Sequence, residues 1–364
     1  MNESFQSSRA PEPEVNPVTA SMRTGNNVSE TDPFDLLRQI AGGYCVSRAV
    51  HVLAELNVAD ALDDTPQSAA ELAKSTGADP DALYRILRLT SAHGIFQTEG
   101  DRFKHSPASR MLRSDHPQSM RSFVRMFGLA NNWSAYGELE HSVRTGRPAT
   151  EKTLPEGFWT YLAQAPEANS IFNETMLAKA RGQIPAIVAS YDFSQFDVIA
   201  DIAGGRGHLI SAILESAQRT RGILFDLPHV VKEAAAMKSP RLTLTSGDFF
   251  KDPLPRCDGY ILMEIIHDWP DKEAIAILQS IRRAAAPQAR LLLIEAIVPN
   301  DPGPDWSKML DIHMLTLLGG KQRTLSEYRM LLDQSGFSFQ REIDSGAGIS
   351  ILEATAKAIQ ATNE

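Results

Sequence analysis

The sequence changes character at Phe196, and this change constrains the fold more than any other feature. From that point, short apolar runs typical of buried strands alternate with segments of helical periodicity. Such alternation predicts βαβ units, in which helices cover both faces of a parallel sheet. The expected strands are Val198–Ile202, Ile223–Asp226, Leu242–Thr245, Tyr260–Ile266 and Leu291–Ile297, and the expected helices cover residues 208–218, 228–237, 271–285 and 325–335.

Two further strands are expected at the end of the chain. Phe337–Glu342 and Ile349–Ala354 are joined by the short connection 345–348, which contains two glycines. A connection this short predicts an antiparallel hairpin, because parallel strands need a much longer crossover. We therefore expect an α/β fold whose parallel sheet is closed by an antiparallel C-terminal hairpin.

A different pattern precedes the sheet, from Phe34 to about Ser106. Apolar residues at helical spacing predict short helices over 34–53, and Asp79 followed by Pro80 marks the start of a helix that ends near Gly94. Residues 95–104 then predict a small β-wing. Helices followed by a wing are typical of a winged-helix module, and further helices are expected over 107–185.

Winged-helix modules bind DNA or serve as dimerisation scaffolds, and the charges favour the second role. The helix in the recognition position, Pro80–Ala92, carries only Arg85 and Arg88 as bases, with Asp79 and Asp81 at its start. DNA-reading helices usually place basic or amide side chains near that end. The formal net charge of −9 also disfavours a phosphate backbone. We expect a homodimer and no nucleic-acid partner.

The predicted organisation has four parts: a disordered tail over 1–32, a winged-helix dimerisation domain over 33–110, linker and pocket helices over 111–190, and the α/β domain over 191–364. The tail lacks the apolar core of a secretory signal. No apolar run approaches the roughly 18–20 residues that span a bilayer. The two cysteines are far apart, which fits a reducing compartment. We expect a cytoplasmic protein with no membrane partner.

A glycine-rich turn, residues 203–207, separates the first strand of the sheet from the following helix. Glycines in this place let the backbone approach a ligand closely. Asp226 ends the next strand, where an acid can accept ribose hydroxyls, and Asp248 and Phe249 follow the third strand, where they suit an adenine. The glycine spacing does not match the dinucleotide pattern GxGxxG well. These strand ends favour S-adenosylmethionine over NAD, with a plain tight turn as the alternative.

A histidine follows the fourth strand. His267 lies where open α/β sheets place ligands and chemistry, and histidine can act as a general base near neutral pH. Glu295 ends the fifth strand, beside the fourth. A carboxylate bonded to one ring nitrogen fixes the tautomer and stabilises the imidazolium, as in a catalytic dyad. The pair therefore predicts proton abstraction at this edge of the sheet.

These motifs together resemble the S-adenosylmethionine-dependent O-methyltransferases of the plant caffeate type, which include bacterial and fungal enzymes that modify natural products. The resemblance implies a winged-helix dimerisation domain, a Rossmann-like methyltransferase domain and no metal requirement. It covers about residues 34–355 and is carried by DIAGGRG at 201–207, FDLPHVV at 225–231, GDFF at 247–250, IIHDWPD at 265–271, IEAIVP at 294–299 and GGKQRT at 319–324.

The resemblance also implies roles for individual residues. His267 takes the position of the general base, Glu295 that of the supporting acid, and Gln322 lies at the position of a second acid. Cofactor contacts are implied for Gly204, Gly205, Asp226, Asp248, Phe249 and Met263. Contacts to an aromatic acceptor are implied for Met176, Asp268, His313, Met314 and Leu317.

The chain departs from the family pattern at three positions. Ala203 replaces the first glycine of the usual triple run, a change expected to matter little. Met263 replaces a lysine of the plant enzymes, so a contact there would be apolar or through the backbone. Gln322 replaces an acid beside the histidine. A neutral amide can hydrogen-bond the imidazole but cannot offset its positive charge.

The expected function is methylation of a hydroxyl on an aromatic or polyketide-like small molecule, with S-adenosylhomocysteine as the second product, in secondary-metabolite or antibiotic biosynthesis. One alternative is N-methylation of a heteroaromatic ring such as a phenazine, where a lone pair is already available and His267 only positions the substrate. Another alternative is a ligand sensor or DNA-binding protein that has lost catalysis.

Overall fold

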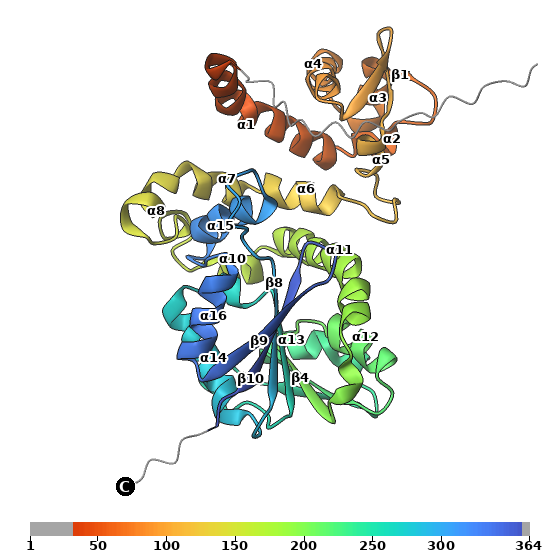
Figure 1. Cartoon of the computed structure of the whole chain (residues 1–364). Helices are drawn as coiled ribbons and strands as arrows, with labels where there is room; N and C mark the ends of the chain where they lie inside the picture. Colours follow the sequence, from red (N-terminus) through yellow and green to blue (C-terminus); the bar gives the residue numbers. More distant parts are fainter. Residues whose placement is uncertain (1–31, 359–364) are drawn as a thin grey trace, which may run out of the picture. The chain divides into compact units, whose positions relative to one another are not determined.

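The computed structural model describes residues 32–358. Its central feature is a seven-stranded sheet in the order β6-β5-β4-β7-β8-β10-β9. The first five of these strands run parallel, and β10 pairs antiparallel with both β8 and β9 (Figure 1). This confirms the predicted sheet and hairpin. The strands are β4 (Val198–Ile202), β5 (Arg221–Asp226), β6 (Leu242–Ser246), β7 (Gly259–Met263), β8 (Arg290–Glu295), β9 (Phe337–Asp344) and β10 (Ser350–Ala356).

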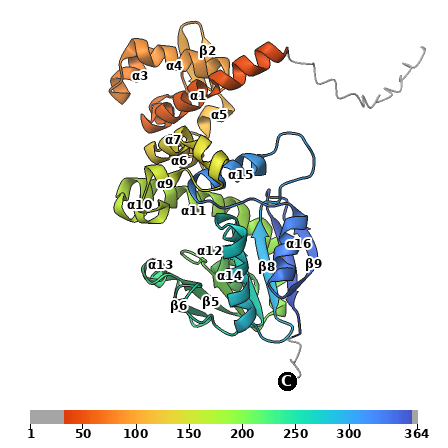
Figure 2. The same ribbon diagram turned by 90° about the vertical axis from the view of Figure 1, so that its left-hand side faces the viewer.

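Helices cover both faces of this sheet. On one face lie α14 (Asp271–Ala284) and α16 (Leu325–Gln334), and on the other lie α11 (Pro166–Ser190) and α12 (His208–Ser216) (Figure 1). Figure 2 shows the sheet from β5 and β6 at one side to β9 at the other. The helix expected over 228–237 forms as α13 (Pro228–Glu233) followed by the 3₁₀ turn η2 (Ala234–Met237).

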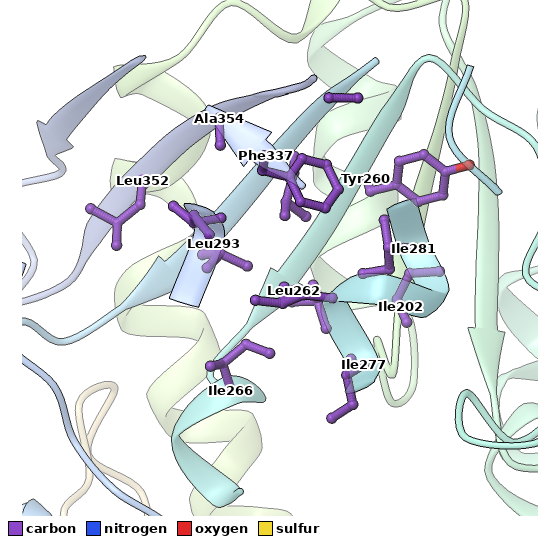
Figure 3. Close-up of a cluster of buried hydrophobic side chains, with 14 of the residues drawn as sticks. Ile202, Tyr260, Leu262, Ile266, Ile277, Ile281, Leu293, Phe337, Leu352 and Ala354 are labelled. Atoms are coloured by element: carbon purple, nitrogen blue, oxygen red, sulfur yellow. The ribbon is translucent and has the colours of Figure 1, made fainter. Parts of the chain in front are cut away.

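The two-residue period of the strands builds two cores, one on each face. Tyr260 and Leu262 of β7 point into the cluster beneath α14 and α16, whereas Ile261 points into the cluster beneath α11 and α12. Figure 3 shows the first cluster, to which Leu293 of β8 and Ile277 of α14 also belong. Burying each such side chain stabilises the fold by about 1.5–3 kcal/mol. The central strands are therefore fixed, and with them the positions at which they end.

Strand β7 is shorter than predicted. It ends at Met263 rather than Ile266, because Glu264 has a φ of 54° and turns the chain out of the sheet. The next residues form the 3₁₀ turn η3 (Ile266–Asp268). The apolar run over 260–266 therefore has two causes: its first part is a buried strand, and Ile266 is buried from a turn.

The N-terminal part contains the expected helices and wing. The helix α3 (Ala69–Thr76) stops at Gly77, and Asp79 caps α4 (Pro80–Ala92) by accepting a hydrogen bond from Ala82. The wing is formed by β2 (Phe96–Glu99) and β3 (Arg102–His105), and β1 (Gln67–Ser68) adds an edge that the sequence did not predict.

The first helix differs from the prediction of short helices over 34–53. A single helix, α1 (Pro33–Glu55), covers this stretch, because Gly42 and Gly43 lie within it without breaking it. The residues up to Cys45 belong to one compact unit and those from Val46 onward to a second. Residues 1–31 of the predicted tail lie outside the described part of the chain, and the three boundaries between the four predicted parts stay predictions.

Short helices fill the stretch before the sheet. The helix α15, which follows β8 in the chain, was not predicted, because its apolar residues are spread around the helix rather than along one face. None of the helices within residues 32–358 combines the length and apolar character needed to cross a membrane. The remaining helices are α2 (Val58–Ala61), α5 (Pro107–Arg110), α6 (Arg121–Gly128), α7 (Ala130–Gly137), α8 (Leu139–Thr145), α9 (Thr150–Thr153), α10 (Phe158–Gln164), η1 (Phe193–Gln195) and α15 (Trp306–Leu317).

A buried arginine ties the segment after α15 to the loop after β7. Arg323 is completely buried, and its guanidinium donates to the carbonyl oxygens of Ile266 and Trp269 at 3.0 and 2.8 Å. It also donates to Asp271, at the start of α14, at 2.8 Å. Buried carbonyl groups need such partners because unpaired ones are costly. The conformation of η3 therefore depends on this cation.

Gly320 lies against the same loop, and its lack of a side chain is required there. A Cβ atom at Gly320 would lie 2.1 Å from the carbonyl oxygen of His267 and 2.6 Å from the carbonyl carbon of Asp268. Both are backbone atoms, which cannot rotate away as a side chain could. The segment 319–324 and the turn η3 are thus packed in backbone-to-backbone contact.

We predict that Gly320→Ala lowers the free energy of unfolding by about 1–3 kcal/mol or more, as overpacking does. Gly137→Ala is the matched control, because no atom lies within 4 Å of its added Cβ. The control should change the free energy by less than about 0.5 kcal/mol. Urea denaturation followed by tryptophan fluorescence measures both. Equal stability of the two variants would show that the segment can withdraw from His267 freely.

Candidate active site

The predicted motifs meet at the carboxyl edge of the parallel strands. The register pairs Ile202 of β4 with Phe225 of β5, and Met263 of β7 with Ile294 of β8. The glycine turn therefore lies beside Asp226, and the turn η3 lies beside Glu295. Ligands of open α/β sheets bind outside this edge, near the point where the strand order reverses. Here that point lies between β4 and β7, which places both motifs around it.

The glycine turn after β4 is shaped by Asp201. A Cβ atom at Gly204 would lie 2.4 Å from the Cγ atom of Asp201, so only glycine fits. Gly205 has a φ of 59°, in the left-handed region that glycine adopts easily. Asp201 is buried, and neither oxygen of its side chain has a hydrogen-bond partner among the described residues. Burial and the nearby charge of Asp226 raise the pKa of Asp201 to about 7.

The expectation for Ala203 was wrong. Its φ is 57°, so the first position of the turn needs the left-handed conformation. A Cβ atom in that conformation costs roughly 1–2 kcal/mol. The backbone of Ala203 is therefore strained. The hydrogen bond from its N–H to the carbonyl oxygen of Phe225, at 2.7 Å, holds it in this conformation.

Asp226 is connected directly to the glycine turn. One carboxylate oxygen accepts a hydrogen bond from the Gly205 N–H at 2.8 Å, and the other accepts one from the Leu227 N–H at 2.7 Å. Burial raises the pKa of Asp226, although these two N–H donors oppose the shift. A carboxylate has about four acceptor positions. Two therefore remain for the hydroxyl groups of a ribose.

The third strand end supplies an acid and aromatic rings. The side chain of Asp248 accepts from the Phe250 N–H at 2.9 Å and from the Lys251 ammonium at 2.8 Å, and these contacts lower its pKa. Phe249 packs edge-to-face with Phe250 and Trp269, at centroid distances of 4.8 and 6.0 Å. An acid that stays ionised next to fixed rings suits an adenine.

The residues at these strand ends fit a nucleoside cofactor such as S-adenosylmethionine. Gly204 leaves no room for a side chain against the turn, Asp226 keeps free acceptor positions, and Asp248 with Phe249 offers a polar and an apolar contact. Met263, half-buried at the end of β7, lies on the same edge. Within residues 32–358, no group of three or more His, Cys, Asp or Glu side chains is placed to hold a metal ion.

His267 is buried between two carboxylates. Glu295 Oε2 lies 3.1 Å from its Nδ1 atom, and Asp268 Oδ1 lies 3.3 Å from its Nε2 atom. Glu295 is completely buried and accepts the Ile266 N–H at 2.9 Å through its other oxygen. The predicted pairing of His267 with Glu295 is therefore present in the structure, and it joins the ends of neighbouring strands.

The Gln322 amide also meets Nδ1, at 2.8 Å. Nδ1 cannot both donate to Glu295 and accept from Gln322. We assign the proton of Nδ1 to the contact with Glu295, because its Oε2 atom has no other donor among the described residues and an unpaired buried carboxylate oxygen is more costly than the rotation of an amide. Gln322 carries an acceptor and a donor on one group, so it can present its oxygen to a protonated Nδ1.

The two carboxylates set the charge of His267. Burial alone would lower the pKa of this ring, but Glu295 and Asp268 together raise it to about 10. The ring is therefore an imidazolium at neutral pH in this arrangement. Before it can accept a proton at Nε2, the proton already there must leave.

The predicted acceptor residues lie on two helices and the turn η3. His313 of α15 is buried, and its Nδ1 lies 3.2 Å from the Tyr136 hydroxyl. Burial, followed by the positive charges of Lys179 and His267, lowers the pKa of His313 to about 4. Its neutral ring also lies 4.7 Å from the ring of Phe127, centroid to centroid.

The other predicted acceptor residues are placed differently. Met314 is buried on α15, and Met176 is partly buried on α11. Leu317 packs with Leu154 and Phe158 in a separate apolar cluster. Acceptor contacts for these three residues stay predictions.

Sequence reasoning missed three residues beside the site. Arg323 and Gly320 belong to the motif GGKQRT but had no role until their contacts with η3 were seen. The third, Lys179, binds Glu264 across 85 positions of sequence at 2.5 Å. Nothing in the local sequence around Lys179 pointed to that contact. The sequence did offer one sign of a buried ion pair: Glu264 is a charged residue within the otherwise apolar run that precedes His267.

We predict that Asp226→Ala weakens the binding of S-adenosylhomocysteine by at least about tenfold, because a hydrogen bond to a charged group contributes about 1.5–3 kcal/mol. Asp197→Ala, at the opposite end of β4, is the control and should bind normally. Equilibrium titration measures both affinities. If a folded Asp226→Ala variant binds S-adenosylhomocysteine with unchanged affinity, Asp226 does not contact the cofactor.

Two family models match the chain. The model of the O-methyltransferase domain matches residues 136–338, which is more than half of the sequence. The model of the O-methyltransferase dimerisation domain matches residues 38–115. The first covers the five parallel strands β4 to β8 and the site and ends at the start of β9, and the second covers the wing and the helices around it.

Characterised proteins resemble the chain over most of their length. A phenazine O-methyltransferase of Lysobacter antibioticus is 39% identical over 338 residues, covering 91% of this chain and 99% of its own. An 8-amino-8-demethylriboflavin N,N-dimethyltransferase of Streptomyces davaonensis is 35% identical over 303 residues, covering 80% and 86%.

Solved structures of methyltransferases are also similar to this chain. The O-methyltransferase NcsB1 from neocarzinostatin biosynthesis, in complex with S-adenosylmethionine and 2-hydroxy-5-methyl naphthoic acid, has a TM-score of 0.75 and 33% identity, over 85% of this chain and 95% of its own. With a matching family model, close relatives and the predicted fold in place, the chain belongs to the O-methyltransferase family and is a methyltransferase.

Proposed function

We propose that this protein transfers the methyl group of S-adenosylmethionine to a hydroxyl of an aromatic small molecule in natural-product biosynthesis, with His267 as the general base. The observation that carries the proposal is the position of His267. Its ring is held by Glu295 at the carboxyl edge of the sheet, next to the strand ends that fit the cofactor. The relatives support the acceptor class, because one methylates phenazines and another binds a hydroxylated naphthoic acid.

Each part of the site has a role in this proposal. Asp226 and the glycine turn bind the nucleoside, and Asp248 with Phe249 binds the adenine. When bound, S-adenosylmethionine supplies an electrophilic methyl group on a positively charged sulfur. Asp268 and His313 orient the acceptor, whose hydroxyl takes the place of Asp268 at the Nε2 atom of His267. Holding both reactants in contact supplies much of the acceleration, since aligned reactions reach effective molarities of about 10⁵ M or more.

The proton on His267 sets the order of events. An imidazolium cannot accept the hydroxyl proton, so the ring must first release its Nε2 proton to the solvent. The positively charged sulfur of the bound S-adenosylmethionine lowers the pKa of the ring, and so does a weaker contact between the ring and Asp268. Binding of the two reactants therefore moves His267 toward its basic form, in which Nε2 is free and Glu295 still holds Nδ1–H.

We predict that His267→Ala lowers turnover by about 10²–10⁴-fold at pH 7. The loss should shrink toward pH 10, because a phenol with a pKa of about 10 then ionises without help. Turnover of the native enzyme should rise with pH as the raised pKa of His267 is approached. The assay follows transfer of a radiolabelled methyl group to a panel of phenols and naphthols.

His93→Ala, an exposed histidine at the end of α4, is the control and should keep native turnover. Affinity for S-adenosylhomocysteine should be unchanged in both variants. Near-native turnover of His267→Ala across pH 6–9, on a good acceptor, would show that this residue does not abstract a proton.

A second function is favoured by the charge of His267. If the ring stays protonated, it can position an acceptor but cannot deprotonate it. A heteroaromatic nitrogen needs no base, which makes N-methylation the alternative. The riboflavin relative methylates an amino nitrogen, which supports this alternative. In that case turnover falls as pH rises and His267 loses its proton, which is opposite to the trend expected for a base.

We also propose that the protein is a homodimer. The match to the dimerisation domain supports this, and so does the first half of α1. There Phe34, Leu37, Ile40 and Tyr44 recur at helical spacing, and between 64% and 74% of each side chain is exposed. An apolar helix face of this kind is typical of an interface between two chains.

We predict a dimer at micromolar concentration by analytical ultracentrifugation. The double variant Leu37→Asp/Ile40→Asp should sediment as a monomer, because it puts two charges into an apolar interface. Gln39→Asp adds a charge to the same helix outside the apolar set and should remain dimeric. A native protein that sediments as a monomer would contradict the dimer.

A further inference from the structure

One ion pair beside the site has no role in the mechanism above. The ammonium of Lys179, on α11, donates to Glu264 Oε1 at 2.5 Å. Both side chains are largely buried, with 27% of Lys179 and 14% of Glu264 exposed. The pair joins the middle of α11 to the residue that directly follows β7. It therefore lies at the edge of the sheet where the reaction takes place.

The neighbours of Lys179 place it on the acceptor side of this edge. Met176, a predicted acceptor residue, lies three positions earlier and on the same face of α11. The positive charge of Lys179 acts on His313, the second predicted acceptor residue, together with that of His267. Glu264 lies three positions before His267 itself. The ion pair is thus close in the chain to Met176 and His267, and its cation is near enough to His313 to lower the pKa of that ring.

Stability does not explain this arrangement. A largely buried ion pair is often no more stabilising than an apolar pair of the same size, because both charges lose their hydration. Glu264 also has a φ of 54°, a left-handed conformation that is costly for a residue with a side chain. Two unfavourable features at the same residue are typical of a site that is kept for binding or catalysis.

Lys179 keeps unused hydrogen-bonding capacity. An ammonium group has three N–H donors, and in the part of the chain that the structure describes Lys179 uses one, toward Glu264. Glu264 therefore fixes the direction of the ammonium and leaves donors for another group. Of the two charged side chains, Lys179 is the more exposed and is therefore the more accessible to a ligand.

We propose that Lys179, oriented by Glu264, is a specificity residue that binds an acidic substituent, such as a carboxylate, on the aromatic acceptor. The proposal rests on the methyltransferase function proposed above and adds the substrate class. Lys179 donates to the carboxylate while it stays bonded to Glu264.

The test compares acceptors that differ only in charge. The probes are 2-hydroxy-1-naphthoate, its methyl ester and 2-naphthol, titrated calorimetrically into the full-length protein saturated with S-adenosylhomocysteine. Lys179→Met should weaken binding of the naphthoate by about tenfold or more, as expected for the loss of a hydrogen bond to a charged group. Binding of the two neutral probes should change by less than about threefold. Lys179→Arg should restore most of the affinity for the naphthoate, because it keeps the charge.

Two further variants complete the test. Glu264→Gln removes a negative charge next to the ammonium and should tighten binding of the naphthoate alone. Lys152→Met breaks an exposed ion pair with Glu138 at 2.7 Å and should leave all three affinities unchanged. A loss of equal size for all three probes in Lys179→Met, a weaker naphthoate complex in Glu264→Gln, or a weaker complex with S-adenosylhomocysteine in either variant would overturn the proposal.

The outcome for this residue is separate from that for the proposed function. Binding is measured without turnover, so a protein that binds the naphthoate through Lys179 but methylates none of the phenols contradicts the proposed function only. A protein that methylates 2-naphthol and the naphthoate with the same KM before and after Lys179→Met retains the proposed function and refutes the role of Lys179.

Discussion

The site depends on one buried guanidinium. Arg323 is fully buried, and it binds the carbonyl oxygens of the turn η3 and the carboxylate of Asp271. The same chain segment carries Gln322, whose amide lies 2.8 Å from Nδ1 of His267. One cation therefore fixes both the backbone that carries the imidazole and the residue beside it. Gly320 completes this arrangement, because its missing side chain lets the two backbones touch.

The charge of the imidazole follows from where the strands end. Because β7 and β8 are neighbours in register, Glu295 lies against Nδ1, and the following residue of the turn brings Asp268 to Nε2. A ring between two carboxylates holds its proton strongly, whereas a ring with one carboxylate at Nδ1 leaves Nε2 free. In the proposed mechanism, the contact with Asp268 separates a resting ring from a reactive one. Gln322 suits this change better than an acid, since it adds no further negative charge to a site that already has two.

The regular part of the fold could be predicted from the sequence, because strand and helix periods report directly on burial. The pairing of His267 with Glu295 could also be predicted, since adjacent parallel strands end at the same edge. Other features depend on backbone angles or on distant packing. The strain at Ala203 and the early end of β7 at Glu264 come from positive φ values that no residue type announces. The contact of Lys179 with Glu264 depends on how α11 lies across the sheet, which its own sequence does not determine.

The long helix α11 has a consequence for how such a protein can change over time. The groups that fit the cofactor follow short turns after the strands, whereas Met176, Lys179 and His313 lie on two helices, α11 and α15. With the acceptor and cofactor residues that we propose, mutations on these helices alter the preferred acceptor while the turns that bind the nucleoside keep their geometry. On this proposal, the substrate range can diverge, in nature or in a directed-evolution library confined to α11 and α15, without a change in the residues at the sheet edge that carry the reaction.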